Sequence, residues 1–173
     1  MLKNQDIVVL LALIGRERTE WDFVTLGDSL ELSASAVHRA VGRLRDAGLY
    51  SAERGAVRAE AAAEFVVHAA KFIAPLEQSA VARGVPTGAT AAPLADALTE
   101  PAERAVEAAW VWPHPEGTRR GTAVAPLLSA VPGIALRDPV MHRRLAALDA
   151  LRGGRARERQ LAASWFRQEL GLA

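Results

Sequence analysis

The stretch Leu32–Tyr50, LSASAVHRAVGRLRDAGLY, carries the strongest structural signal in the chain. Its apolar residues recur at intervals of three and four, which places them on one face of an amphipathic helix. They are Val37, Ala40, Val41, Leu44 and Ala47. Ser33 stands where a hydroxyl accepts a hydrogen bond from a first-turn amide, and Gly48 follows as a stop signal. The stretch therefore predicts a helix that packs on one side.

The opposite face of that helix is polar and basic, with no acidic residue before Asp46. Such a face fits the major groove of DNA, where an arginine donates two hydrogen bonds to O6 and N7 of guanine. The predicted DNA-contacting residues of this helix are Ser33, Ser35, His38, Arg39 and Arg43. The alternative is an amphipathic helix whose arginines are merely solvated.

The segment before it, Leu26–Ser33 (LGDSLELS), predicts the end of a shorter helix, a tight turn and the cap of the next helix. Together the two helices resemble the helix-turn-helix of bacterial winged-helix regulators of the MarR-like kind, whose run is roughly LAxxLGLSxSxVxRxLxxLxxxGL. The matching residues are Leu26, Leu30, Leu32, Ser33, Ser35, Val37, Leu44, Gly48 and Leu49. The resemblance covers about residues 5–60 and implies a transcriptional regulator that binds double-stranded DNA.

Glu31 departs from the family pattern, because it occupies the turn position where that pattern usually has glycine. A non-glycine residue in the left-handed conformation costs about 1–2 kcal/mol. We therefore expect a strained turn between the two helices.

The segment Leu49–Ala59 predicts the hairpin, or wing, that follows the two helices in this family. Gly55 offers the positive φ that a tight hairpin requires. Arg54 at the tip and Arg58 on the returning strand are predicted to contact phosphates or a minor groove. The alternative is that both side chains point into water.

A first helix is expected from Asn4 or Asp6 through Ile14, and it is apolar on most of its sides. An all-round apolar helix is usually buried, and in the family that the chain resembles this helix often packs at a dimer interface. We expect a homodimer, because two-fold proteins read paired half-sites on DNA. Candidate dimer surfaces are this helix and the apolar residues Phe65, Val66 and Phe72.

The expected fold class is mainly α with a small β wing: an N-terminal winged helix-turn-helix followed by a smaller α+β module. Residues 1–74 are predicted as the winged helix-turn-helix domain and residues 75–108 as a linker broken by proline and glycine, with one short helix. Residues 109–173 are predicted as a hairpin plus a two-helix interaction module. Trp110, Trp112 and His114 either line a pocket in that module or pack its hairpin.

Charge is distributed unevenly along the 173 residues, although the whole chain carries only +1. Residues 1–60 carry −1, residues 61–136 carry −2 and residues 137–173 carry +4. DNA affinity must therefore come from local arginines or from a dimer that doubles them. The basic C-terminal part predicts a second binding surface, at Arg152, Arg155, Arg157 and Arg159.

Three targets are open for this surface: flanking DNA phosphates, an acidic protein partner, or acidic helices of the same chain. Residues 149–159 loosely resemble the tail of small winged-helix proteins of a toxin–antitoxin-like arrangement. The alternative function is therefore an antitoxin-like interaction protein that binds a protein partner through its C-terminal module and represses its own gene.

Several classes of function find no support in the sequence. The chain has no cysteine, so disulfides, thiolate metal sites and thiol catalysis are excluded. It has none of the nucleotide-binding, metalloprotease or hydrolase motifs, and its four histidines lack ligand spacing. We therefore expect no enzyme activity and no cofactor. The apolar run Ile7–Ile14 is too short to span a membrane, and we expect a cytoplasmic protein without a membrane partner.

Overall fold

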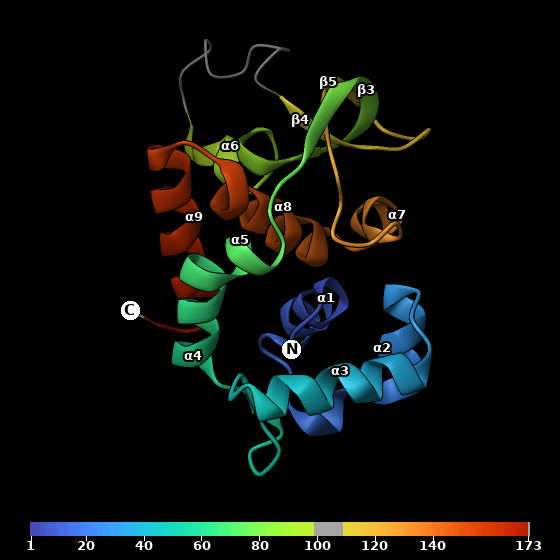
Figure 1. Ribbon diagram of the computed structural model, residues 1–173, viewed down its shortest axis with the longest axis vertical. Coiled ribbons are helices and arrows are strands. Elements are labelled where there is room, and N and C mark those ends of the chain that lie inside the picture. Colours follow the sequence, from blue (N-terminus) through green and yellow to red (C-terminus); the bar gives the residue numbers. More distant parts are fainter. Residues whose placement is uncertain (99–108, 173) are drawn as a thin grey trace.

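The computed structural model describes residues 1–98 and 109–172. Over these residues the chain is mainly helical with small sheets, as expected (Figure 1). The elements of the first part are α1 (Asn4–Leu13), η1 (Arg18–Glu20), α2 (Phe23–Leu30), α3 (Ala34–Asp46), β1 (Tyr50–Ser51), β2 (Ala56–Val57), α4 (Ala59–Glu64), η2 (Phe65–Ala69) and α5 (Ala70–Ile73). Those of the second part are β3 (Gln78–Thr87), η3 (Gly88–Thr90), α6 (Leu94–Ala97), β4 (Trp110–Pro113), β5 (Arg119–Val124), α7 (Val131–Arg137), α8 (Pro139–Gly153) and α9 (Ala156–Glu169).

The helix α1 lies at the centre of the molecule. Every residue from Asp6 to Ile14 is buried, because apolar side chains leave this helix in all directions and neighbouring elements cover each side. Figure 1 shows α1 between α3 and α8, which both contact it. The predicted burial is confirmed, but the cover comes from the same chain. The prediction that α1 offers a dimer surface is therefore wrong.

Local capping places α2 and α3. Asp22 begins α2, since its carboxylate accepts hydrogen bonds from the amides of Val24 (2.8 Å) and Thr25 (2.9 Å). Ser33 begins α3 as predicted, because its hydroxyl accepts from the Ala36 amide at 3.2 Å. These two caps fix where each helix starts, and the turn between the helices is correspondingly short.

Glu31 closes that turn in the left-handed conformation, with φ 55° and ψ 38°, as expected from its place in the pattern. Its carboxylate forms an ion pair with Arg137 at the end of α7, at 2.7 Å. Gly27 lets the turn fold back on α2, because a Cβ there would lie 2.5 Å from the Leu32 carbonyl oxygen. The turn therefore depends on one glycine and tolerates one strained glutamate.

The strands β1 and β2 form the predicted hairpin. Tyr50 pairs with Val57 and Ser51 with Ala56, in antiparallel register. Gly55 has the expected positive φ of 65°, and a Cβ at this position would lie 2.5 Å from Cβ of Arg18. The hairpin therefore folds back onto the η1 segment.

The strand β3 corrects the prediction for residues 75–108. This segment contains a ten-residue strand where a linker was expected; residues 99–108 lie outside the described residues. β3 pairs antiparallel with β5 through Val81 and Thr122, and antiparallel with β4 through Val85 and Trp112. β4 and β5 also pair with each other, in parallel, so the three strands close on themselves. The predicted C-terminal hairpin is therefore wrong, whereas the short helix predicted before it is present as α6.

Glycines allow the three strands to approach this closely. A Cβ at Gly84 would lie 2.0 Å from the Trp112 carbonyl oxygen, and one at Gly121 would lie 2.4 Å from that of Ala109. The glycine that weakens an isolated strand also marks sites of close backbone approach. Gly84 by itself disfavours a strand, but pairing with β4 and β5, which lie more than twenty residues later in the sequence, stabilises one there.

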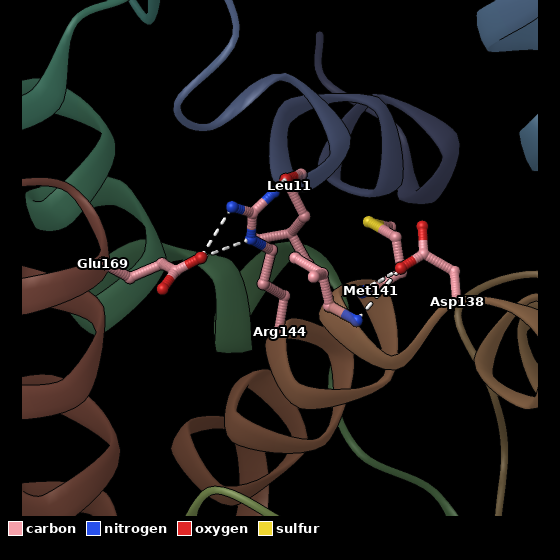
Figure 2. A network of polar contacts seen from close by, with 6 residues as sticks. Leu11, Asp138, Met141, Arg144 and Glu169 are labelled. Carbon is pink, nitrogen blue, oxygen red and sulfur yellow. Dashed lines mark hydrogen bonds and ion pairs between the residues drawn. The ribbon is translucent and has the colours of Figure 1, made fainter.

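A buried arginine joins the three helices α1, α8 and α9 (Figure 2). Arg144 of α8 donates from Nε and Nη2 to the Glu169 carboxylate of α9, at 2.8 and 2.6 Å. Its Nη1 donates to the Leu11 carbonyl of α1 at 2.8 Å. Asp138 caps α8 by accepting from the amides of Val140 and Met141. One hydrophobic core consequently includes residues from α1, α3, α8 and α9.

A second buried polar network lies between α8 and the three-stranded sheet. Asp149 accepts hydrogen bonds from the Thr87 hydroxyl (2.9 Å), the Trp112 indole (2.8 Å) and Arg152 Nη1 (2.6 Å). Burial raises the pKa of Asp149, and the Arg152 guanidinium opposes that shift. The carboxylate is therefore held in place by donors from β3, β4 and α8 itself.

Candidate nucleic-acid interface

The outer face of α3 carries the exposed polar side chains of the predicted DNA reader. Ser35, His38 and Arg39 are exposed, whereas Val37, Ala40 and Leu44 on the inner face are buried. The inner face packs on α1 and α2, which holds the helix rigidly in the fold. Five residues of this helix and its cap were predicted to contact DNA. Four of them lie on its outer face or at its N-cap: Ser33, Ser35, His38 and Arg39.

The residues at the start of α3 have defined neighbours. The Ser33 and Ser35 hydroxyls lie 3.2 Å apart and share a hydrogen bond. The His38 ring packs edge-to-face on Phe23 of α2, with centroids 5.1 Å apart. Arg39 has no hydrogen bond or ion pair with any described residue, so its guanidinium keeps all its donors for a partner.

Arg43 does not belong to this exposed face. It forms a bidentate ion pair with Asp6 of α1, through Nε at 2.8 Å and Nη2 at 2.6 Å, and the Asp6 carboxylate is fully buried. The hydrogen bonds that Arg43 donates to Asp6 raise the pKa of Arg43 above its ordinary value. The guanidinium that was predicted to contact DNA is therefore engaged within the fold, with a buried carboxylate whose other hydrogen bond comes from the Lys3 amide.

Arg54 and Arg58 are exposed on the hairpin, as predicted. Arg54 lies in the loop between β1 and β2, where its amide donates to the Ser51 hydroxyl at 3.2 Å. Arg58 follows β2 directly, and its amide donates to the Leu49 carbonyl at 2.9 Å. Both backbones are fixed while both side chains reach outward, and in Figure 1 the hairpin projects from the molecule beside α3.

The predicted partner-binding arginines divide into two kinds. Arg152 is buried, with a side chain only 3% exposed, and it donates to Asp149 and to the carbonyls of Ala74 and Pro75. Arg159 donates to the Gly154 carbonyl that precedes α9. The buried side chain of Arg152 is used within the fold, which corrects its predicted role in partner binding, whereas Arg159 is exposed and its role stays a prediction. Arg155, the N-cap of α9, and Arg157 on its first turn are exposed.

Of the two tryptophans of β4, Trp112 follows the packing alternative. Trp112 is buried, and its indole N–H donates to Asp149, while its ring lies 5.8 Å from that of His142. His114 accepts a hydrogen bond from the Glu116 amide at 3.2 Å within the following turn. The packing alternative accounts for Trp112, which is a core residue.

A hollow of about 260 Å³ lies between α3, η1 and the hairpin, and it was not predicted from the sequence. The side chains that define this α3–hairpin hollow are Arg18, Trp21, Phe23, His38, Arg45 and Tyr50. The Arg18 guanidinium lies over the rings of Trp21 and Phe23, at 4.6 and 5.2 Å from their centroids. Arg18, Trp21 and Phe23 are close in sequence, but Tyr50 and Arg45 come from later elements, so only folding assembles the group.

Among residues 1–98 and 109–172 no group of three or more His, Asp or Glu side chains is arranged to hold a metal ion. None of the described helices is long and apolar enough to cross a membrane. Comparison with protein-family models, with curated proteins and with solved structures finds no match. Function therefore has to be inferred from the chain's own side chains.

Proposed function

We propose that the protein is a sequence-specific DNA-binding transcriptional regulator, in which residues 1–74 form a winged helix-turn-helix. The observation that carries this proposal is the outer face of α3, where exposed Ser35, His38 and Arg39 stand on a helix whose other side is packed. A reading helix needs both properties, because it must present side chains to base edges and hold them in a fixed register.

The order of elements supports the same proposal. α2, the turn at Glu31, α3 and the β1–β2 hairpin follow one another as in winged helix-turn-helix proteins. In such proteins the second helix enters the major groove, while flanking segments contact the backbone. Arg39 is then the base-reading residue, Ser33, Ser35 and His38 lie beside it, and Arg54 and Arg58 of the hairpin contact phosphates or a minor groove.

Low net charge makes a dimer part of the proposal. Residues 1–60 carry −1, so one copy has no general basic field to attract DNA. Two copies double the local arginines and read two half-sites about one turn of DNA apart. With α1, Phe65 and Val66 buried, the remaining candidate for the dimer surface is Phe72, which is 79% exposed.

The alternative function, an antitoxin-like protein that binds a partner through its C-terminal module, has less support. Arg152 and Arg159 form hydrogen bonds within the chain. Only Arg155 and Arg157 of the four predicted residues keep exposed side chains without a described partner. Two arginines on one exposed helical turn are ordinary surface, so we favour the DNA-binding function.

The test is selection of binding sequences from a random double-stranded DNA pool, followed by affinity measurements on the enriched sequence. We expect a palindromic motif, and we expect Arg39→Ala to weaken binding by about tenfold or more, because a bidentate arginine–guanine contact contributes about 1–3 kcal/mol. Arg120→Ala, an exposed arginine on β5, is the matched control and should bind like the wild type. A pool that shows no enrichment would refute the proposal.

A further inference from the structure

We propose that the open edge of β3, together with Arg83 and Arg120, binds an extended acidic segment of a partner protein by adding it to the sheet as a further strand. This inference goes beyond DNA binding and does not depend on it. Three features support it: an edge that no described strand covers, two arginines that face each other, and the place of the sheet in the molecule.

The first half of β3 has one open edge. β4 ends at Pro113, opposite Gly84, so it covers only the second half of β3, while β5 pairs with the other edge from Gln78 to Gly84. Among residues 1–98 and 109–172 no strand pairs with the remaining edge over Gln78–Ala82, which we call the β3 edge. Its backbone N–H and C=O groups can therefore pair with an added strand.

The side chains of the β3 edge leave it accessible. Ser79, Ala80 and Val81 are exposed, and Val81 is 56% exposed. Proteins commonly protect an edge with charged side chains or proline, and the sequence QSAVA from Gln78 to Ala82 has neither. A bulge, where Ser79 and Ala80 oppose a single residue of β5, confines regular pairing to the stretch after it. That stretch leads directly to Arg83.

Two arginines face each other across β3 and β5. Arg83 and Arg120 are register partners, and both are exposed. Neither guanidinium has a hydrogen bond or ion pair with any residue that the structure describes. Like charges directly opposite on neighbouring strands destabilise a sheet. A carboxylate bound between them would offset this repulsion, because each guanidinium has five donors to offer.

The charge of the sheet selects an acidic partner. Residues 61–136 carry −2, yet residues 78–87 and 109–124, which contain the three strands, carry +2. The charged residues of these two stretches are Arg83, Glu116, Arg119 and Arg120. An extended acidic peptide matches both this charge and the open backbone. A nucleic acid matches only the charge, since it has no amides to pair with a strand.

The sheet lies at the opposite end of the molecule from the proposed DNA-contacting face. In Figure 1, β3, β4 and β5 are at the top, whereas α3 and the β1–β2 hairpin are at the bottom. A duplex bound to α3 therefore leaves the β3 edge uncovered. We expect the partner protein and DNA to bind independently of each other.

Fluorescence anisotropy of labelled peptides with the full chain tests binding. The probe is EVEVEV, whose glutamates lie on one face of a strand. KVKVKV reverses the charge. EVPPEVE keeps three glutamates, but one of its two adjacent prolines must present a missing N–H to β3. EVEVEV should bind at least about tenfold more tightly than either control, the loss expected for about one charge-assisted hydrogen bond.

Two results of this assay would contradict the proposal. No binding of EVEVEV up to about 1 mM, a concentration that still detects weak association, would overturn it as a whole. Equal binding of EVEVEV and EVPPEVE would show that charge alone holds the peptide, and would overturn strand addition.

Charge reversal locates the bound peptide. Arg83→Glu and Arg120→Glu should each weaken EVEVEV binding by about tenfold or more, because an attraction becomes a repulsion. The melting temperature of either variant should not fall, since each replaces a like-charge pair by an opposite one. The double variant should prefer KVKVKV to EVEVEV. Arg39→Glu, on exposed α3 at the other end of the molecule, is the control and should bind EVEVEV like the wild type.

Unchanged EVEVEV binding by both single variants, or by the double variant, would place the peptide elsewhere and overturn the assignment. Amide hydrogen exchange, followed by NMR, then tests the geometry. Saturating EVEVEV should slow exchange at Val81 or Ala82 in the wild type, because an added strand accepts a hydrogen bond there. Unchanged exchange at both amides would overturn strand addition.

DNA affinity separates this proposal from the proposed function. Arg83→Glu should bind the selected DNA like the wild type, with or without EVEVEV. Weaker DNA binding by Arg83→Glu would make the sheet a nucleic-acid surface and overturn the proposal. If no DNA sequence is enriched at all, the proposed function fails, while the peptide assays still decide the β3 edge.

Discussion

The arginines of α3 and those of α8 and α9 look alike in the sequence and differ in the folded chain. Arg39 is exposed on α3 with no described partner, whereas Arg144 and Arg152 on α8 are buried against carboxylates and carbonyl oxygens. Both regions were predicted as binding surfaces from clustered positive charge. On α8 and α9 the exposed arginines, such as Arg155 and Arg157, stand beside others that the fold uses internally, whereas Arg39 lies on a helix face made of exposed polar side chains.

The difference shows that what faces an arginine decides its role. Guanidinium groups are the usual choice for buried pairs, because their planar fork matches a carboxylate with two hydrogen bonds. Arg43 is a second example, within α3 itself: it lies one helical turn from Arg39, but it pairs with Asp6 of α1. A basic cluster in a sequence is therefore as consistent with buried ion pairs within the chain as with a binding surface.

We expect the largest effect on the free energy of unfolding from removing the buried ion pair between Arg152 and Asp149. Arg152→Ala leaves the Asp149 carboxylate buried beside Thr87 and Trp112, and breaking a buried pair typically costs about 3–5 kcal/mol. Urea unfolding should show this loss in the free energy of unfolding. Arg143→Ala, on the same helix but exposed, is the control and should change it by less than about 0.5 kcal/mol. Equal stability of the two variants would contradict the conclusion that Arg152 stabilises the fold.

The next effect separates Arg43 from Arg39 on α3. Arg43→Ala should lower the free energy of unfolding by about 2–3 kcal/mol, because it strands the buried Asp6 carboxylate. Arg39→Ala should leave stability unchanged and weaken only DNA binding. Measuring the free energy of unfolding and the DNA affinity of both variants distinguishes a residue that stabilises the fold from one that contacts DNA. A stable Arg43→Ala protein with weakened DNA binding would restore Arg43 to the reading face.

Salt dependence sharpens the comparison at the hairpin. If Arg54 and Arg58 neutralise phosphates, each substitution to alanine should lower the slope of log affinity against log salt by about 0.9. The double variant Arg155→Ala, Arg157→Ala should leave that slope unchanged, since we assign these residues no DNA contact. A changed slope in the α9 variant would show that the C-terminal arginines reach the duplex after all.

The smallest effect concerns the turn before α3. Glu31→Gly removes left-handed strain worth about 1–2 kcal/mol but also removes the exposed ion pair with Arg137, worth about 0–1 kcal/mol. We expect a net stabilisation of about 1 kcal/mol in thermal unfolding. In an Arg137→Ala background, where the pair is already absent, the gain should be larger. No gain in either background would mean that the turn is not strained.

Local signals in the sequence predicted the helices and hairpin of the first part. The caps at Ser33 and Gly48, the spacing of Val37 and Leu44, and Gly55 in the hairpin all act within a few residues, so a single sequence reveals them. The outer face of α3 followed directly from this spacing. Four of the five helix residues predicted to contact DNA remain available there.

Long-range contacts account for what the sequence did not reveal. Arg43 meets Asp6 across 37 positions, and Arg152 meets Ala74 across 78, so neither brace has a local signature. Gly84 and Pro86 each disfavour a regular strand locally, yet pairing with β4 and β5 includes both of them in β3. The α3–hairpin hollow also needs three separate elements. Prediction failed where the partner lay far along the chain.

The burial of α1 also sets an order of events during synthesis. Its cover includes α8, and Arg144 reaches the Leu11 carbonyl across 133 positions. At about 5–20 residues per second, a ribosome makes α8 roughly 7–27 s after α1. Throughout that interval the apolar side chains of α1 that α8 later covers are exposed, and holdase chaperones bind exposed apolar segments of this kind. The nascent chain should therefore bind them until α8 emerges.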